Sequence, residues 1–201
     1  MTLAARVDGR VLRGRRTRES VVEAFLSLIE EGDPQPRART IAARAGVSLR
    51  SVFQHFSDLE ELYLAAGKRE MAKVKPMLAA IDSRLPRDER VARFVSQRVQ
   101  ALEAMAPVAK AARLREPFSV QLRANRDGLK RQFRNGIEET FAPELRTMMR
   151  DRRDDLVEAI LAAGSFSAWY ALREEQRLEV DRAEAVLGLV VGRLVGGASN
   201  P

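Results

Sequence analysis

Apolar residues recur with helical spacing along almost the whole chain. Near the N-terminus, four of them fall at i, i+4, i+7 and i+8, which is one face of an amphipathic helix: Val21, Phe25, Leu28 and Ile29. This helix is predicted to begin near Thr17 and to end at Gly32, because glycine favours a helix end and Pro34 cannot continue the hydrogen-bond ladder. No stretch alternates apolar and polar residues between turn residues, as a strand would. The pattern therefore predicts an all-α fold.

Further helices are predicted wherever the same periodicity returns. They are expected at residues 38–45, 49–56, from 57 onward, 87–106, 108–116, 119–141, 145–173 and 181–195. Ser57 and Glu60 have the spacing of a capping box at the start of the fourth helix. Prolines at 107, 117 and 143 separate the later segments. These elements suggest a compact head and a larger helical bundle, joined through the fourth helix.

Residues 41–56 have the composition of a helix-turn-helix. Small Ala42 allows two helices to approach closely, and Gly46 can supply the left-handed residue of a tight turn. Ser48 can cap the helix that follows. That second helix would present Arg50, Ser51 and Gln54 outward, and all three side chains can hydrogen-bond base edges in the major groove of DNA. The motif therefore predicts a DNA-binding head.

Charge supports a polyanionic partner. The formal net charge is +7, and residues 10–18 contain five arginines and no acid. Such a run has two interpretations that the sequence leaves open, a solvated arm or an electrostatic contact with DNA. The chain has no cysteine, which excludes disulfides and thiolate metal sites. It also has no apolar run of about 18 residues and no signal-peptide pattern, so we expect a cytoplasmic protein that does not enter the membrane.

Three segments together resemble the tetracycline-repressor (TetR) family of transcriptional regulators. They are Ile41-Ala42 with Ala45-Gly46-Val47-Ser48, then Phe53-Gln54-His55-Phe56, then Glu60-Glu61-Leu62. The resemblance covers roughly residues 17–65. It implies an N-terminal three-helix helix-turn-helix head joined to a C-terminal helical bundle for ligand binding and dimerisation. The corresponding domains would be a flexible basic arm at 1–14, the DNA-binding domain at 15–62, and the effector-binding and dimerisation domain at 63–201.

The resemblance further implies a homodimer that binds a double-stranded DNA operator, most often a repressor that a small-molecule effector releases. No cofactor is implied. Contacts with DNA phosphates are expected from the following positions: Arg15, Arg16, Arg37, Ser48, Phe53 and His55. Three positions depart from the family pattern. Phe53 replaces a tyrosine and Leu59 a lysine, so two phosphate contacts are lost, and Arg37 replaces a capping threonine but can donate to phosphate itself.

Candidate pocket and interface residues come from the bundle. The residues that could line an effector pocket are Met105, Phe118, Leu122, Phe133, Phe166 and Trp169, although such residues at helical spacing also form ordinary cores. Glycine inside a helix costs about 1 kcal/mol relative to alanine, so a glycine stripe suggests close helix approach. Two small-residue stripes are therefore assigned to the dimer interface: Gly188, Gly192 and Gly196, and Gly164, Ala168 and Ala171. An intrachain crossing of the two helices is the alternative.

Two other classes of protein remain as alternatives. A helical-bundle di-metal oxidase needs Glu-x-x-His pairs, but Val52 lies three residues before His55, the only histidine. No nucleophile arrangement or phosphate-binding glycine loop is present either, which disfavours an enzyme. A sequence-independent DNA-coating protein would fit the net charge and the arginine run. The outward Arg50 and Gln54 favour sequence-specific reading instead.

Overall fold

The computed structural model describes residues 3–197, and all the regular elements in that range are helical. Residues 1–2 of the expected arm and 198–201 of the expected C-terminal domain lie outside the described residues. The α-helices are α1 (Leu3–Glu30), α2 (Ala38–Arg44), α3 (Leu49–His55), α4 (Leu59–Val74), α5 (Arg87–Arg115), α6 (Val120–Thr140), α7 (Ala142–Arg146), α8 (Arg150–Ala163), α9 (Phe166–Tyr170) and α10 (Val180–Gly196). Short turns η1 (Lys75–Met77) and η2 (Glu116–Phe118) are 3-10 helices, and η3 (Ala171–Glu175) is a π-helix.

The chain divides into two compact units. The first contains residues 1–73 and 107–123, and the second contains residues 74–106 and 124–201. Each unit has its own apolar core. Within residues 3–197, no helix combines the length and the apolar character needed to cross a membrane.

The first unit is built around the inner face of α1. Phe25 is fully buried and meets the ring of Tyr63 edge-to-face, with 4.7 Å between ring centroids. Ile41 of α2, Val52 of α3 and Leu62 of α4 complete the centre of this core. The apolar face that the sequence predicts for residues 21–29 is therefore the face on which the other helices pack.

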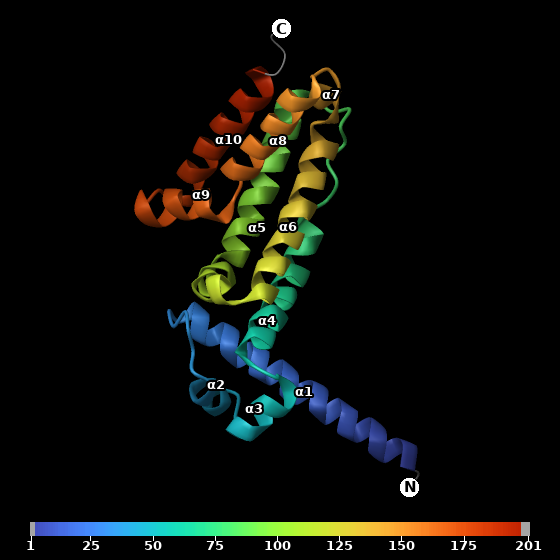
Figure 1. The fold of residues 1–201 in the computed structure, drawn as a ribbon, viewed down its shortest axis with the longest axis vertical. Coiled ribbons are helices and arrows are strands. Elements are labelled where there is room, and N and C mark those ends of the chain that lie inside the picture. Colours follow the sequence, from blue (N-terminus) through green and yellow to red (C-terminus); the bar gives the residue numbers. More distant parts are fainter. Residues whose placement is uncertain (1–2, 198–201) are drawn as a thin grey trace. The chain divides into compact units, whose positions relative to one another are not determined.

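α1 begins earlier than the apolar pattern predicts. The structure places residues 3–14, which we expected to form a flexible arm, in the same continuous helix as the core residues. In Figure 1 this first part of α1 projects beyond the other helices of the first unit. Val11 and Leu12 are about half exposed there, so no apolar face marks this stretch. Its helical state depends on residue propensity and on extension of an already formed helix.

The second unit is a helical bundle made of α6 to α10 and the first part of α5 (Figure 1). Ile137 and Phe141 belong to its core, together with Ile160 of α8 and Val191 of α10. Phe94 of α5 packs against two rings, stacking on Phe133 and meeting Phe141 edge-to-face. The bundle is thus closed by large side chains from four helices.

Two expected helix boundaries in the bundle are wrong. α5 continues through Pro107, where we expected a break, because a proline removes one backbone donor but the ladder can resume on either side of it. The single helix expected at 145–173 is instead divided into α7, α8, α9 and the π-helical turn. α8 ends at Gly164, and Ser165 caps α9 by accepting a hydrogen bond from the Ala168 backbone N–H at 3.1 Å.

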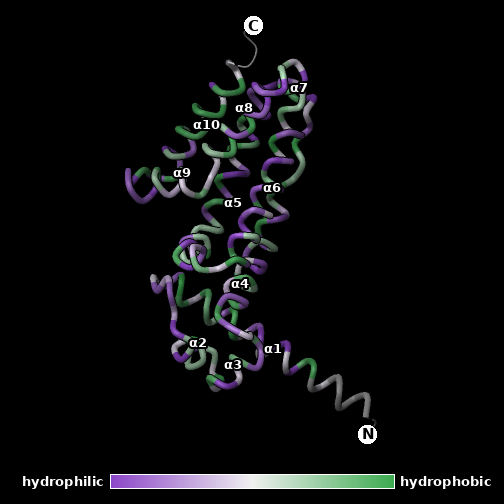
Figure 2. Tube along the Cα trace, in the orientation of Figure 1, coloured by the Kyte–Doolittle hydropathy of each residue, from purple (hydrophilic) through white to green (hydrophobic). Residues whose placement is uncertain are grey.

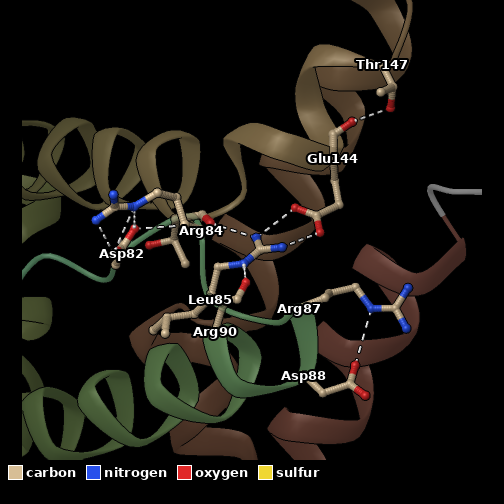
Figure 3. Close-up of polar contacts among 9 residues, drawn as sticks. Asp82, Arg84, Leu85, Arg87, Asp88, Arg90, Glu144 and Thr147 are labelled. Atoms are coloured by element: carbon tan, nitrogen blue, oxygen red, sulfur yellow. Dashed lines mark hydrogen bonds and ion pairs between the residues drawn. The ribbon is translucent and has the colours of Figure 1, made fainter.

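A buried ion pair connects α5 to α7. The guanidinium of Arg90 donates to both carboxylate oxygens of Glu144, at 2.6 and 2.8 Å, and to the carbonyls of Thr140 and Leu85 (Figure 3). The Arg90 side chain is 4% exposed and that of Glu144 is 10% exposed. Burial alone would raise the pKa of Glu144, but the hydrogen bonds and positive charge of Arg90 outweigh burial and hold that pKa below its ordinary value.

This depressed pKa predicts a loss of stability in acid. Because the unfolded chain binds a proton to Glu144 at higher pH than the folded one does, the stabilisation is present above about pH 4.5 and is lost as the pH falls through the folded pKa. Glu144→Gln should destabilise the protein near neutral pH, and the difference from wild type should shrink in acid. Urea unfolding from pH 7 to 3 measures it. A difference that stays constant over this range would contradict the assignment.

Gly164 is fixed by packing inside the chain. A Cβ atom built on Gly164 would lie 2.7 Å from Cζ of Phe133, which is closer than real atoms approach. The close neighbour of Gly164 thus belongs to the same bundle, which favours the intrachain crossing, and a subunit contact at Gly164 stays a prediction. Ala168 and Ala171 also lie in different elements, α9 and η3, and so do not extend a helical stripe from Gly164.

Two glycine-to-alanine substitutions should have opposite effects. Gly164→Ala must displace Phe133 and should cost about 1–3 kcal/mol of unfolding free energy. Gly136→Ala is the matched control, because its Cβ meets nothing within 4 Å. Replacing a glycine inside a helix should stabilise that variant by about 0.5–1 kcal/mol. Chemical denaturation of both variants measures this, and equal stabilities would contradict the packing.

Candidate nucleic-acid interface

The turn between α2 and α3 depends on a left-handed glycine. Gly46 has φ +67°, and its N–H donates to the carbonyl of Ala43 while the N–H of Val47 donates to that of Ala42. These two bonds form a Schellman motif, which ends α2 and satisfies its last carbonyls. Residues with a Cβ rarely adopt this backbone conformation, so the prediction for Gly46 is confirmed.

α3 begins at a side-chain cap. The Ser48 hydroxyl accepts a hydrogen bond from the Ser51 backbone N–H at 3.1 Å, as the sequence predicts. Val52 is 1% exposed and holds the inner face of α3 against α1 and α2. The arrangement is a helix-turn-helix with one face of α3 buried and the other exposed.

The three expected base-reading residues lie toward the open side of α3. Arg50 and Gln54 are exposed, and Ser51 is half-buried. Arg50 and Gln54 are four positions apart, which places them on the same face one turn from each other. Two long polar side chains are therefore available to a ligand along one edge of this helix.

The expected phosphate contacts are spread around this edge. Arg37 is exposed immediately before α2 and makes no side-chain cap, and Ser48 is exposed at the start of α3. Phe53 is 47% exposed on α3, so it does not serve as a core residue. Arg15 and Arg16 are exposed on α1.

α1 lies beside the C-terminal end of α3. The ring of His55 packs near Gly14, where an added Cβ would be 3.7 Å from the ring carbon Cε1. Arg15 and Arg16 directly follow Gly14, so the fold brings the arginine-rich part of α1 close to the end of α3. The arginines of α1 and the exposed residues of α3, which lie more than thirty positions apart in the sequence, therefore belong to one surface.

Arg18 is the residue that joins these elements, and sequence reasoning did not single it out. Its guanidinium lies 4.2 Å from the ring centre of Phe56 and donates to the backbone carbonyl of His55, the last residue of α3. It also pairs with Glu61 of α4, with 3.0 Å between nitrogen and oxygen. One side chain thus contacts the ends of α3 and α4 from α1.

Glu61 also caps α4, one position later than the capping box expected at Ser57 and Glu60. The Asp58 carboxylate accepts from the Glu61 backbone N–H at 2.8 Å, and Glu61 accepts from the Ser57 backbone N–H at 2.9 Å. The box shifts because Asp58 is the residue that caps α4, which begins at Leu59. The Ser57 N–H and then Arg18 lower the pKa of Glu61 against the opposing effect of burial. A charged Glu61 therefore stabilises the junction of α3, α4 and α1.

The six expected pocket residues are divided between the two units. Phe118, which is 86% exposed, and buried Leu122 belong to the first unit. Met105, Phe133, Phe166 and Trp169 belong to the second. Trp169 is buried and its indole N–H donates to Glu103 at 2.7 Å, which is an ordinary core arrangement. Two surface hollows of the described residues are lined by other residues.

Several solved structures of transcriptional regulators have a similar fold. A TetR-family transcriptional regulator from Streptomyces coelicolor superimposes with a TM-score of 0.73 and 19% sequence identity over 92% of this chain and 82% of its own. The chain has the TetR fold. A transcriptional regulator from Rhodococcus sp. Rha1 gives a TM-score of 0.71 and 21% identity over 92% of this chain and 99% of its own.

A TetR-like transcriptional regulator, also from Rhodococcus sp. RHA1, has a TM-score of 0.59 and 20% identity over 94% of this chain and 97% of its own. No protein-family model matches the chain, and no curated protein matches it. The TetR fold extends over nearly the full length, whereas the sequence resemblance covers only the head.

If α3 reads DNA as the sequence predicts, Arg18→Met should reduce DNA discrimination more than overall affinity. The substitution keeps an apolar contact on Phe56 but removes the donors to His55 and Glu61, so the end of α3 loses its anchor. We expect discrimination between a selected DNA sequence and an unrelated one to fall about tenfold. The control is Arg16→Met, which removes an exposed charge and should weaken binding to both DNAs alike. Fluorescence anisotropy measures both, and identical behaviour of the two variants would contradict a positioning role for Arg18.

Proposed function

We propose that this chain is a sequence-specific DNA-binding transcriptional regulator of the TetR family. The observation that carries the proposal is the helix-turn-helix in which α3 is held by Ser48, Val52 and Arg18 while Arg50 and Gln54 remain exposed. A rigid helix with outward polar side chains fits the major groove of DNA, where each base pair presents a distinct set of donors and acceptors.

The basic face of α1 supplies the sequence-independent part of binding. Arg15 and Arg16 lie next to the end of α3 and can neutralise phosphates on either side of the groove. Arg13, which precedes them on the same helix, is also exposed. Arg37, Ser48 and His55 supply further phosphate donors in this proposal, and Phe53 supplies only apolar contact. The fold class and the resemblance both favour a cytoplasmic repressor that a small-molecule effector releases from its operator.

Gln54 provides the test of base reading. Gln54→Ala should cost about 1–3 kcal/mol of binding free energy at one base position and relax sequence preference there. Selection of bound fragments from random DNA, followed by titration on single-base variants, locates that position. The control is Arg39→Ala, an exposed residue of α2, which should leave the base preference intact. If Gln54→Ala keeps the wild-type preference at every base, α3 does not read through Gln54.

Homodimerisation is the second part of the proposal. One α3 offers only about two helical turns, so tight specific binding needs two heads that meet half-sites about 34–36 Å apart. α10 is a largely hydrophobic helix (Figure 2) whose buried positions, such as Leu187 and Val191, face the core of its own bundle. Leu189, 62% exposed, and Val190, 39% exposed, lie on its outer side. A two-fold contact through this outer face would bury them.

The glycine stripe borders this face. An added Cβ at Gly188 would meet nothing within 4 Å, and those at Gly192 and Gly196 would meet only Val91 and Arg87, each at 3.9 Å. None of the three is thus required for a tight crossing within the chain. In the proposed dimer, these glycines allow the partner's α10 to approach closely.

Leu189→Glu should dissociate the dimer. Each subunit would place a carboxylate in the apolar contact, so the substitution acts twice in a two-fold interface. We expect a monomer at micromolar concentration by analytical ultracentrifugation, with a folded head and weaker operator binding. Val120→Glu changes an exposed apolar residue elsewhere and should leave the protein dimeric. A dimeric Leu189→Glu protein would place the interface on another surface.

A further inference from the structure

Arg98 is a cation inside the second unit that lacks an acidic partner. Its Nε–H donates to the carbonyl of Gly164, at the C-terminal end of α8, at 2.6 Å. Its guanidinium carbon lies 3.8 Å from the ring centre of Phe133. The ring of Phe94 also stacks on that of Phe133. In the part of the chain that the structure describes, no carboxylate lies within ion-pair distance of Arg98.

Other arginines of the same bundle are neutralised by a carboxylate. Arg90 pairs with Glu144, Arg134 with Glu158, and Arg173 with Glu103. Arg98 differs from them because its contacts are a backbone carbonyl and an aromatic face. A guanidinium has five N–H donors, and the contact with Gly164 uses one of them.

The absence of a counter-charge is unfavourable at this position. Burial lowers the pKa of Arg98 to about 10. Because this value is still well above 7, the guanidinium is charged at neutral pH. A desolvated cation without an ion pair destabilises the fold that contains it, unless another group supplies a negative charge. The helix end at Gly164 and the ring of Phe133 each offer only partial negative charge.

The side chain of Arg98 is not fully enclosed by the bundle. Arg98 is half-buried, so its side chain is not sealed inside the core and retains some accessible surface. A ligand can approach the charged fork while the stem of Arg98 stays held by Phe133 and Gly164.

We propose that the second unit binds a small organic carboxylate whose charged group pairs with the two outer nitrogens of Arg98. Planar carboxylates match the guanidinium fork with two parallel hydrogen bonds. The aromatic neighbours Phe94 and Phe133 favour an apolar body next to the carboxylate. This inference rests on the proposed function in that it names the chemical class of the effector.

A single charge at this site favours a carboxylate over a phosphate. A phosphate monoester carries about 1.5 to 2 negative charges at neutral pH and usually meets several cations. Arg98 supplies one positive charge. Phosphate esters are thus the poorer match, and they serve as a negative comparison in the test.

The test uses wild-type protein without DNA and three carboxylates of different shape: benzoate, phenylacetate and octanoate. Each is compared with its uncharged amide and with phenyl phosphate, by calorimetry and by thermal unfolding. At least one carboxylate should bind and raise the unfolding temperature, while its amide and phenyl phosphate bind at least about tenfold more weakly. Failure of all three carboxylates to bind, or equal binding of an acid and its amide, would overturn the proposal.

Arg98→Met is the decisive variant. It should weaken carboxylate binding about tenfold or more, and without ligand it should be as stable as wild type or more stable, because an unpaired cation has been removed. Arg93→Met, an exposed residue on the same helix, should bind like wild type. Arg98→Lys keeps the charge and should fold but bind more weakly. If Arg98→Met is less stable without ligand, Arg98 serves only to hold Gly164 and Phe133, and the proposal fails.

The anion site and the regulatory function can fail separately. A carboxylate that binds at Arg98 but leaves DNA affinity unchanged would support the site and contradict its role as the effector site. DNA binding by α3 with no carboxylate binding would support the proposed function and overturn this inference. Anisotropy of labelled DNA with and without the bound acid distinguishes these results.

Discussion

A helix of seven residues is too short to persist in water by itself, and α3 has seven. Its stability therefore comes entirely from what fixes its two ends and its inner face. Ser48 holds the first turn, Val52 holds the middle against the core, and Arg18 of α1 holds the last carbonyl at His55. Because these contacts lie on the inner side or at the ends, Arg50 and Gln54 stay exposed. The proposed reading of DNA depends on this separation between the inner face and ends of α3, which are fixed, and its outer face, which is exposed.

Local features of the helix-turn-helix could be predicted from the sequence because they depend on neighbours in the chain. Gly46 was identifiable since a left-handed residue must follow α2, and Ser48 since a cap must precede α3. Arg18 could not be recognised in the same way. It lies 37 positions from His55 and looks like one more member of an arginine run until the fold brings the two together. Long-range polar contacts leave no periodic pattern in the sequence.

What the sequence could not predict in the bundle has related causes. Gly164 was assigned to a small-residue stripe because spacing alone cannot distinguish a contact with Phe133 of the same chain from a contact with a partner. Pro107 was expected to interrupt a helix, but α5 continues through it. The arginines 90 and 98 are equivalent in sequence, yet one has Glu144 as its partner and the other has a carbonyl and a ring. Whether an arginine is neutralised by a carboxylate is a property of the packed structure. The difference between Arg90 and Arg98 is the basis for the proposed ligand site at Arg98.

Sequence-specific recognition of DNA is the central claim, and a salt titration tests it directly. The protein would be titrated from 50 to 300 mM salt against a duplex selected from genomic DNA and against a scrambled duplex of equal composition. Both affinities should fall with salt because arginine–phosphate contacts release counterions. The selected duplex should remain tighter by about a thousandfold or more across the range, as in specific protein–DNA complexes. Equal affinity for the two duplexes at every salt concentration would show a sequence-independent DNA-binding protein and would contradict the account.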